Sequence, residues 1–129
     1  MTRIGRTRHR GPRAAVVKIV NDRDQGTIAC ESCVLADTAL IRMKGLLGRK
    51  QLSPGEGLLL RPTSSIHTFF MRFSIDVVFL DRNLQVLAVA PSVKPWRAVA
   101  RRGARAVLEL PKDECRRRRI RPGDRLRVE

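Results

Sequence analysis

The alternation of apolar and polar residues along the chain predicts a succession of short β-strands. Short apolar runs are separated throughout by clusters of Gly, Pro, Asn, Asp and Ser, which are typical of turns. Short strands at this spacing favour a sandwich or a barrel over a parallel sheet. The predicted strands are Ala14–Asn21, Thr27–Leu35, Leu58–Arg61, Ile66–Phe73, Ile75–Asp81, Gln85–Ala90, Trp96–Arg101, Arg105–Leu110 and Arg125–Val128.

Two segments depart from the strand pattern. Leu40, Met43 and Leu47 recur at the spacing of one helical face, which predicts a short helix near residues 38–47. An Asp-Thr pair that can cap a helix precedes this stretch, and a glycine follows it. Residues 112–119 are expected to form one or two further helical turns.

The positive charge of the chain is concentrated at its two ends. The 129 residues include 27 Lys and Arg against 12 Asp and Glu, which gives a formal net charge of +15. Residues 1–13 hold five Arg and no acid, and they read as a disordered basic arm before a single domain over residues 14–129. This distribution predicts weak, salt-dependent binding of a polyanion such as nucleic acid through Arg3–Arg13 and Arg116–Arg119.

The small number of aromatic residues, and the excess of Arg over Lys, argue against sequence-specific nucleic-acid recognition. Tyr is absent, and the four Phe and one Trp sit in or beside apolar runs. Single-stranded nucleic acid is bound on exposed aromatic side chains, so no stacking platform is expected. Arg outnumbers Lys 22 to 5, which is also typical of a GC-rich genome.

The sequence predicts a cytoplasmic protein with no membrane span, metal or cofactor. No apolar run approaches the roughly 20 residues of a spanning helix, and no signal-peptide core follows the basic N-terminus. An odd number of cysteines fits a reducing compartment. Cys30 and Cys33 lie three apart in a predicted strand, so they should point to opposite faces, about 10 Å apart.

Several blocks, taken in order, resemble a known family. They are Leu35–Thr38, Lys44–Arg49, Gly55–Leu60, Ser65–Asp81, Ala106–Leu110 and Ile120–Asp124. Over roughly residues 35–126 the chain is similar to the domain-of-unknown-function family numbered 192, a family of small uncharacterised proteins. The resemblance implies a mainly-β, jelly-roll-like sandwich or barrel with one short helix after the first strands. It implies no established activity, cofactor or substrate.

The segment 66–80 contains the most informative polar residues. If it is extended, His67 lies on the odd-numbered face, which is the expected core, whereas Arg72 and Asp76 give the even-numbered face a polar centre. A half-buried carboxylate at Asp76 needs a partner, either Arg49 or backbone N–H groups. Asp76 then either pins a loop or helix end, or lines a pocket for a small polar ligand with Arg72 and His67.

Glu109 repeats the same pattern, with one carboxylate between Leu108 and Leu110 in a predicted strand. If Glu109 and Asp76 were neighbours, each would raise the pKa of the other, as in an acid–base pair. Pairing of Glu109 with an arginine is the simpler expectation.

Three functional hypotheses follow. The leading one is a small non-catalytic binding or accessory module with a polar cleft around Arg72 and Asp76, which takes a small polar ligand or a protein partner. The alternatives are a hydrolase-like enzyme that uses Asp76 or Glu109 as acid or base, and a polyanion binder that uses its basic ends. The candidate ligand-binding residues are Arg49, His67, Arg72, Asp76 and Glu109.

Overall fold

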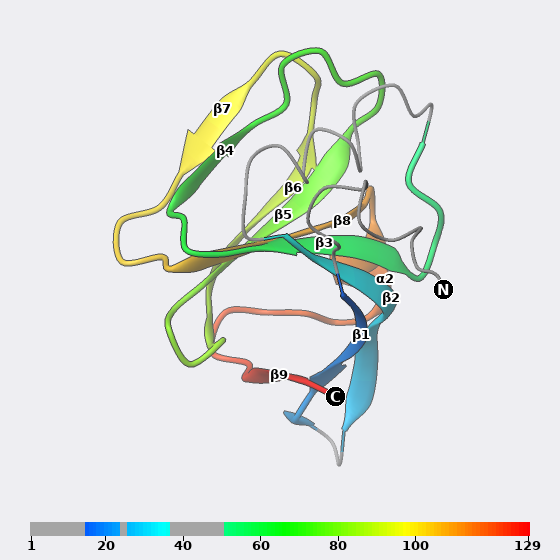
Figure 1. Ribbon diagram of the computed structural model, residues 1–129, viewed down its shortest axis with the longest axis vertical. Coiled ribbons are helices and arrows are strands. Elements are labelled where there is room, and N and C mark those ends of the chain that lie inside the picture. The colour runs from blue at the N-terminus through cyan, green and yellow to red at the C-terminus, as the bar shows by residue number, and fades with distance from the viewer. Residues whose placement is uncertain (1–14, 24–25, 37–50) are drawn as a thin grey trace, which may run out of the picture.

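The computed structural model describes residues 15–23, 26–36 and 51–129, and strands make up most of this part of the chain. The elements are β1 (Val16–Asn21), β2 (Thr27–Ala36), β3 (Glu56–Leu60), β4 (Ser65–His67), β5 (Ile75–Leu80), β6 (Val86–Val93), β7 (Ala98–Ala100), β8 (Ala106–Pro111), α2 (Glu114–Arg117) and β9 (Leu126–Val128). Seven strands form one sheet in the order β6-β5-β8-β3-β2-β1-β9, whereas β4 and β7 form a separate ribbon (Figure 1). The predicted mainly-β fold is confirmed.

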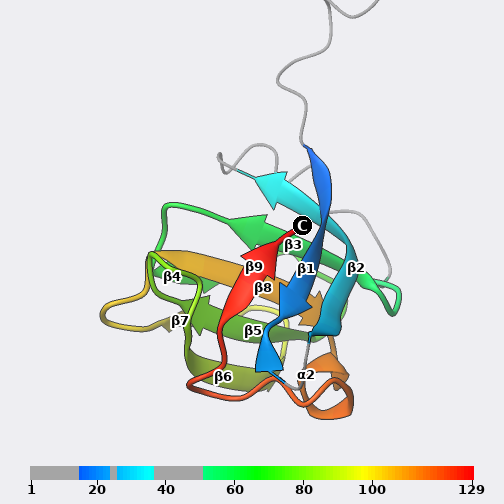
Figure 2. The same cartoon turned by 90° about the horizontal axis from the view of Figure 1, so that it is seen from below.

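The large sheet is mixed and curls toward closure. Neighbouring strands are antiparallel except β2 and β3, which run parallel. Backbone hydrogen bonds join the start of β6 to the segment that leads into β9: Val86 N–H donates to Asp124 O at 2.7 Å, and Leu126 N–H donates to Leu84 O at 2.9 Å. These bonds bring the two edges of the sheet together at one end (Figure 2), which gives the domain its barrel-like shape.

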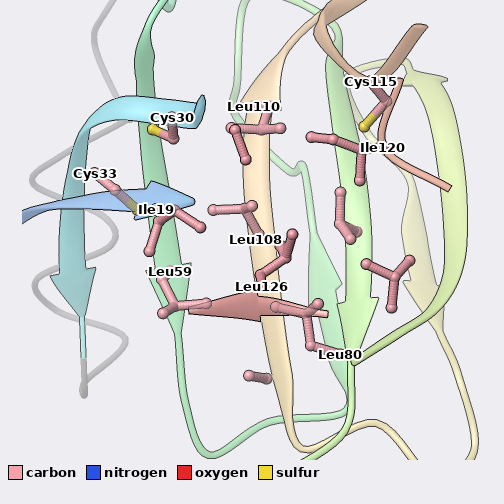
Figure 3. Close-up of a cluster of buried hydrophobic side chains, with 14 residues drawn as sticks. Ile19, Cys30, Cys33, Leu59, Leu80, Leu108, Leu110, Cys115, Ile120 and Leu126 are labelled. Carbon is pink, nitrogen blue, oxygen red and sulfur yellow. The ribbon is translucent and has the colours of Figure 1, made fainter. Parts of the chain in front are cut away.

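The sheet is covered on both faces. Val78, Leu80 and Leu108 face a core that β1, β9 and the α2 region complete (Figure 3). Val77 and Phe79 face a second core on the other side. All six residues of β5 are therefore buried, Asp76 included, and Arg72 lies outside the strand, so the predicted polar centre shared by Arg72 and Asp76 does not form on one strand face. The curl of the sheet covers the first face, whereas Ile66 of β4, Met71 and Leu52 cover the second, and sequence alternation encodes neither arrangement.

The predicted strand over residues 66–73 is shorter in the structure. Extended pairing with β7 ends at His67, and a turn follows. Thr68 explains the break, because its hydroxyl donates to Lys94 O at 2.6 Å and accepts from Arg97 N–H at 2.9 Å. These side-chain bonds replace the strand ladder and tie the turn to the loop before β7.

Other predictions have mixed outcomes. The hairpin of the first two strands is confirmed, and so is the helical turn within residues 112–119. The basic arm, the helix near 38–47 and Arg49 lie outside the described residues. Within the described ranges, no helix is long and apolar enough to cross a membrane.

Candidate functional site

Asp76 fastens three parts of the fold together. Its side chain is 1% exposed, between the apolar residues of β5. Oδ1 accepts a hydrogen bond from Ser92 N–H at 2.9 Å, and Oδ2 accepts one from Cys115 N–H at 3.0 Å. The carboxylate thus connects β5 to the end of β6 and to the first turn of α2. Of the two kinds of partner expected for Asp76, the structure shows backbone N–H groups.

The same carboxylate borders a pocket of about 800 Å³ between β5, β6 and the α2 region. Arginine side chains contribute the positive charge of its lining, and none of them forms an ion pair with a carboxylate in the described parts of the chain. The apolar lining residues offer a surface for a hydrocarbon group. The lining comprises the arginines Arg116, Arg119 and Arg121, the apolar Val89, Pro91 and Ile120, and Asp76, Asp113 and Cys115.

Cys115 lies beside Asp76 but is poorly suited to be a nucleophile. The thiol is 4% exposed, and burial together with the negative charge of Asp76 raises the pKa of Cys115 well above its usual value. Only the thiolate attacks an electrophile. The pocket is therefore lined by a hydrogen-bonded carboxylate, a protonated thiol and three arginines. These groups are better suited to holding an anion than to attacking a substrate.

The raised pKa gives a reactivity prediction. In the folded chain we expect Cys115 to react with iodoacetamide at about pH 8 at least roughly tenfold more slowly than in the urea-unfolded chain, because burial suppresses both the thiolate and access to it. Mass spectrometry of the peptide that carries Cys115, sampled over time, measures the rate. Equal rates in the two states would contradict the prediction.

The structure places Glu109 on the other side of the sheet from Asp76. In the pairing of β5 with β8, Glu109 lies opposite Val77, whereas Asp76 lies opposite Leu110. Directly opposed residues share a face, so Asp76 and Glu109 project in opposite directions. Glu109 is fully buried beside the second core. The two carboxylates therefore do not form an acid–base pair.

His67 and Arg72 also lie away from the Asp76 pocket. His67 is exposed at the end of β4, where Nδ1 accepts a hydrogen bond from Phe69 N–H at 3.2 Å. Arg72 is exposed in the turn between β4 and β5. Neither is among the residues that line the pocket. Of the predicted set, Asp76 is the member that lines it within the described ranges.

The basic run at residues 116–119 is partly neutralised. Glu114, which is 2% exposed, pairs with Arg117 at 2.8 Å and with Arg118 at 2.9 Å. Arg118 also pairs with Glu31 of β2 at 2.8 Å, which lowers the pKa of that carboxyl. The remaining two arginines, Arg116 and Arg119, line the pocket. Sequence reasoning treated this run as one charged patch and missed its division.

The placement of Cys30 and Cys33 corrects the sequence prediction. Both thiols are fully buried in the same core (Figure 3), where their interaction lowers the pKa of Cys30 and raises that of Cys33. The Cys30 thiol donates to Gly55 O at 3.4 Å, and the Cys33 thiol donates to Val34 O at 3.9 Å. Cys33 lies opposite Val17 and Cys30 opposite Ile19, so β2 has one extra residue there. This β-bulge turns both side chains to one face. The described residues hold no cluster of three or more potential metal ligands.

The aromatic residues were also misplaced by the sequence prediction. Phe69 is 38% exposed, Phe70 66% and Trp96 56%, in the turns next to β4 and β7. The turn set by Thr68 directs these rings outward, although the neighbouring sequence is apolar.

The structure shows a small, mainly β, barrel-like protein with a basic, partly apolar pocket. A family model described as "Uncharacterized ACR, COG1430" (DUF192) matches residues 19–128, and the chain belongs to this family. The resemblance seen in the sequence is thus confirmed. A UPF0127 protein of Pyrococcus horikoshii is 39% identical over 85 residues, which are 60% of this chain and 70% of that protein. A UPF0127 protein of Pyrococcus furiosus is 36% identical over 98 residues, which are 70% of this chain and 81% of that protein.

Two crystal structures share the fold. One is a Sinorhizobium meliloti protein, provisionally described as a transcription regulator, with a TM-score of 0.79 and 21% identity over 92% of this chain and 98% of that one. The other is a Novosphingobium aromaticivorans protein of unknown function, with a TM-score of 0.75 and 21% identity over 91% of this chain and 94% of that one. At this identity the likeness establishes the fold alone.

Proposed function

We propose that this protein is a non-catalytic binding module whose pocket beside Asp76 holds a small anionic molecule with an apolar body. The observation that carries the proposal is the lining of the pocket, in which Arg116, Arg119 and Arg121 stand next to an apolar wall. Guanidinium groups bind carboxylates and phosphates through paired hydrogen bonds. The apolar wall adds affinity for the body of the ligand.

A binding role fits the pocket better than a hydrolytic one. An acid–base mechanism needs a second titratable group within reach of the first. Asp76 is committed to two backbone N–H groups, Glu109 lies on the other face, and burial keeps Cys115 protonated. Asp76, Glu109 and Cys115 are thus unavailable as acid, base or nucleophile beside the arginines, but the guanidinium groups are well placed to hold an anion. The site therefore shifts from the predicted Arg72 to the arginines around α2.

Titration with phenyl phosphate, an anion with an apolar ring, tests the proposal. We expect the backbone amide NMR signals of Ser92 and Cys115, which contact Asp76, to shift on binding. The variant Arg119→Ala/Arg121→Ala should bind at least about a hundredfold more weakly, because each guanidinium–phosphate bond contributes about 1.5–3 kcal/mol and two are removed.

Arg82→Ala is the matched control, since it removes an exposed positive charge on the turn between β5 and β6. Its affinity for phenyl phosphate should equal that of the unchanged chain. Absence of shifts around Asp76, or equal losses in Arg82→Ala and the pocket variant, would refute the proposed site.

A further inference from the structure

The β4–β7 ribbon lies far from α2 in both views (Figures 1 and 2), and four rings gather at its end and in the turns next to it. His67 stacks on Phe69 with ring centroids 4.7 Å apart, and Phe69 stacks on Trp96 at 5.8 Å. Phe70 meets the same indole at 4.7 Å and a 59° tilt. We refer to His67, Phe69, Phe70 and Trp96 as the aromatic platform. A shallow groove of about 350 Å³ runs beside it along β7.

The backbone holds two of these rings outward at a conformational cost. Phe70 has φ 69° and Trp96 has φ 65°, in the left-handed region that bulky residues avoid. Such a conformation persists only where the surrounding structure holds it in place. Thr68 stabilises both turns, because its carbonyl accepts from Trp96 N–H at 3.0 Å and from Met71 N–H at 3.2 Å. The exposed rings are therefore positioned before any partner arrives.

All charged residues in the two segments that carry the platform are basic. Residues 61–75 and 94–105 contain no Asp or Glu. Every Lys and Arg in them is exposed. A surface that combines aromatic faces with this charge matches a chain of bases joined by phosphates. The seven cations are Arg61, Arg72, Lys94, Arg97, Arg101, Arg102 and Arg105.

We propose that the aromatic platform binds single-stranded nucleic acid, with unpaired bases stacked on the more exposed Phe70 and Trp96 and phosphates held by the exposed cations of the same two segments. Unpaired bases are required because a duplex hides its base faces inside the helix. The charge favours this partner over an apolar protein surface, which gains nothing from seven cations. This site is separate from the Asp76 pocket, and it differs from the basic ends at which the sequence predicted polyanion contact.

A labelled oligothymidylate of about 12 nucleotides is the probe, chosen to span one binding surface. Trp96 is the sole Trp of the chain, so its fluorescence reports directly on stacking. We expect the oligonucleotide to quench that fluorescence and to lose at least about tenfold in affinity between roughly 50 and 200 mM salt. A duplex of the same length should leave the fluorescence unchanged.

Phe70→Gly/Trp96→Gly tests the rings, because glycine accepts both positive φ values and the removed side chains are exposed. Its affinity, read from fluorescence anisotropy of the label, should fall at least about tenfold. Val128→Ala, which trims an exposed apolar residue on β9, should bind unchanged.

Charge reversal locates the phosphates. Arg97→Glu/Arg101→Glu should abolish most of the binding, whereas Arg82→Glu and Arg116→Glu/Arg119→Glu should retain it. Unquenched Trp96 fluorescence in the unchanged chain would overturn the proposal even if every variant misfolded. Loss of binding in Arg116→Glu/Arg119→Glu alone would also overturn it. A third contrary result would be failure of the oligonucleotide to bind together with a dimer, seen by ultracentrifugation, that Phe70→Gly/Trp96→Gly dissociates.

Discussion

Replacement of Asp76 by alanine is expected to lower the free energy of unfolding by about 3–5 kcal/mol. The variant removes the acceptor for the buried Cys115 N–H and the half-buried Ser92 N–H. Both donors then lose their bonds, and the first turn of α2 loses its attachment to β5. Small domains have only about 5–15 kcal/mol of stability, so the loss is large. Urea denaturation followed by circular dichroism measures it.

Asp81→Ala is a matched control for this prediction. Asp81 also accepts two backbone N–H groups, from Asn83 at 2.8 Å and Gln85 at 2.9 Å, but it does so in an exposed turn. Water replaces those bonds, and we expect a loss of only about 0.5–1.5 kcal/mol. If the two variants lost equal stability, burial of the Asp76 carboxylate would not explain its contribution to the free energy of unfolding.

Replacement of Gly57 by alanine is expected to cost about 3 kcal/mol, because the centre of the sheet has no room for a methyl group. A Cβ at this position of β3 would lie 2.8 Å from Cys30 Sγ, 2.9 Å from Leu110 Cδ2 and 3.0 Å from Glu109 O. The last atom belongs to the backbone of β8 and cannot rotate away. Strand β3 therefore has to shift against β8, which is visible as a lower midpoint of urea unfolding.

Two comparisons isolate the steric cause. Gly123→Ala adds a methyl group with no heavy atom within 4 Å, at a φ of 93°, so it should cost about 1 kcal/mol through backbone strain alone. Cys30→Ala in the Gly57→Ala background removes one of the three close contacts, so it should recover only part of the lost stability. If Gly57→Ala lost no more stability than Gly123→Ala, the sheet would have accommodated the methyl group, and the steric explanation would be wrong.

The described structure thus has two surfaces of different chemistry that lie far apart. The pocket beside Asp76 combines arginines with an apolar wall, whereas the aromatic platform combines stacked rings with exposed cations. Each is tested by variants that leave the other intact. Loss of phenyl phosphate binding with oligonucleotide binding retained, or the reverse, separates the two proposals.

Local pattern was enough to place most of the strands. Alternating apolar runs and turn residues predicted β5, β8 and the hairpin of β1 and β2, because side-chain period and turn chemistry are local properties. The need of Asp76 for a buried partner was also predictable, since a carboxylate inside an apolar strand cannot remain unsatisfied. The family blocks identified the chain before any coordinates.

Tertiary structure decided which residues meet. Curling of the sheet covers one face of β5, and the β4–β7 ribbon and its neighbouring loops cover the other. The register of β5 with β8 separates Asp76 from Glu109, and a bulge in β2 brings Cys30 and Cys33 together. These outcomes depend on hydrogen bonds between segments far apart in sequence, as do the outward turns at Phe70 and Trp96. The sequence by itself determined the strands, the charge and the family, because these are properties of short segments. Only the packing of those segments made a pocket beside Asp76 and exposed the aromatic rings.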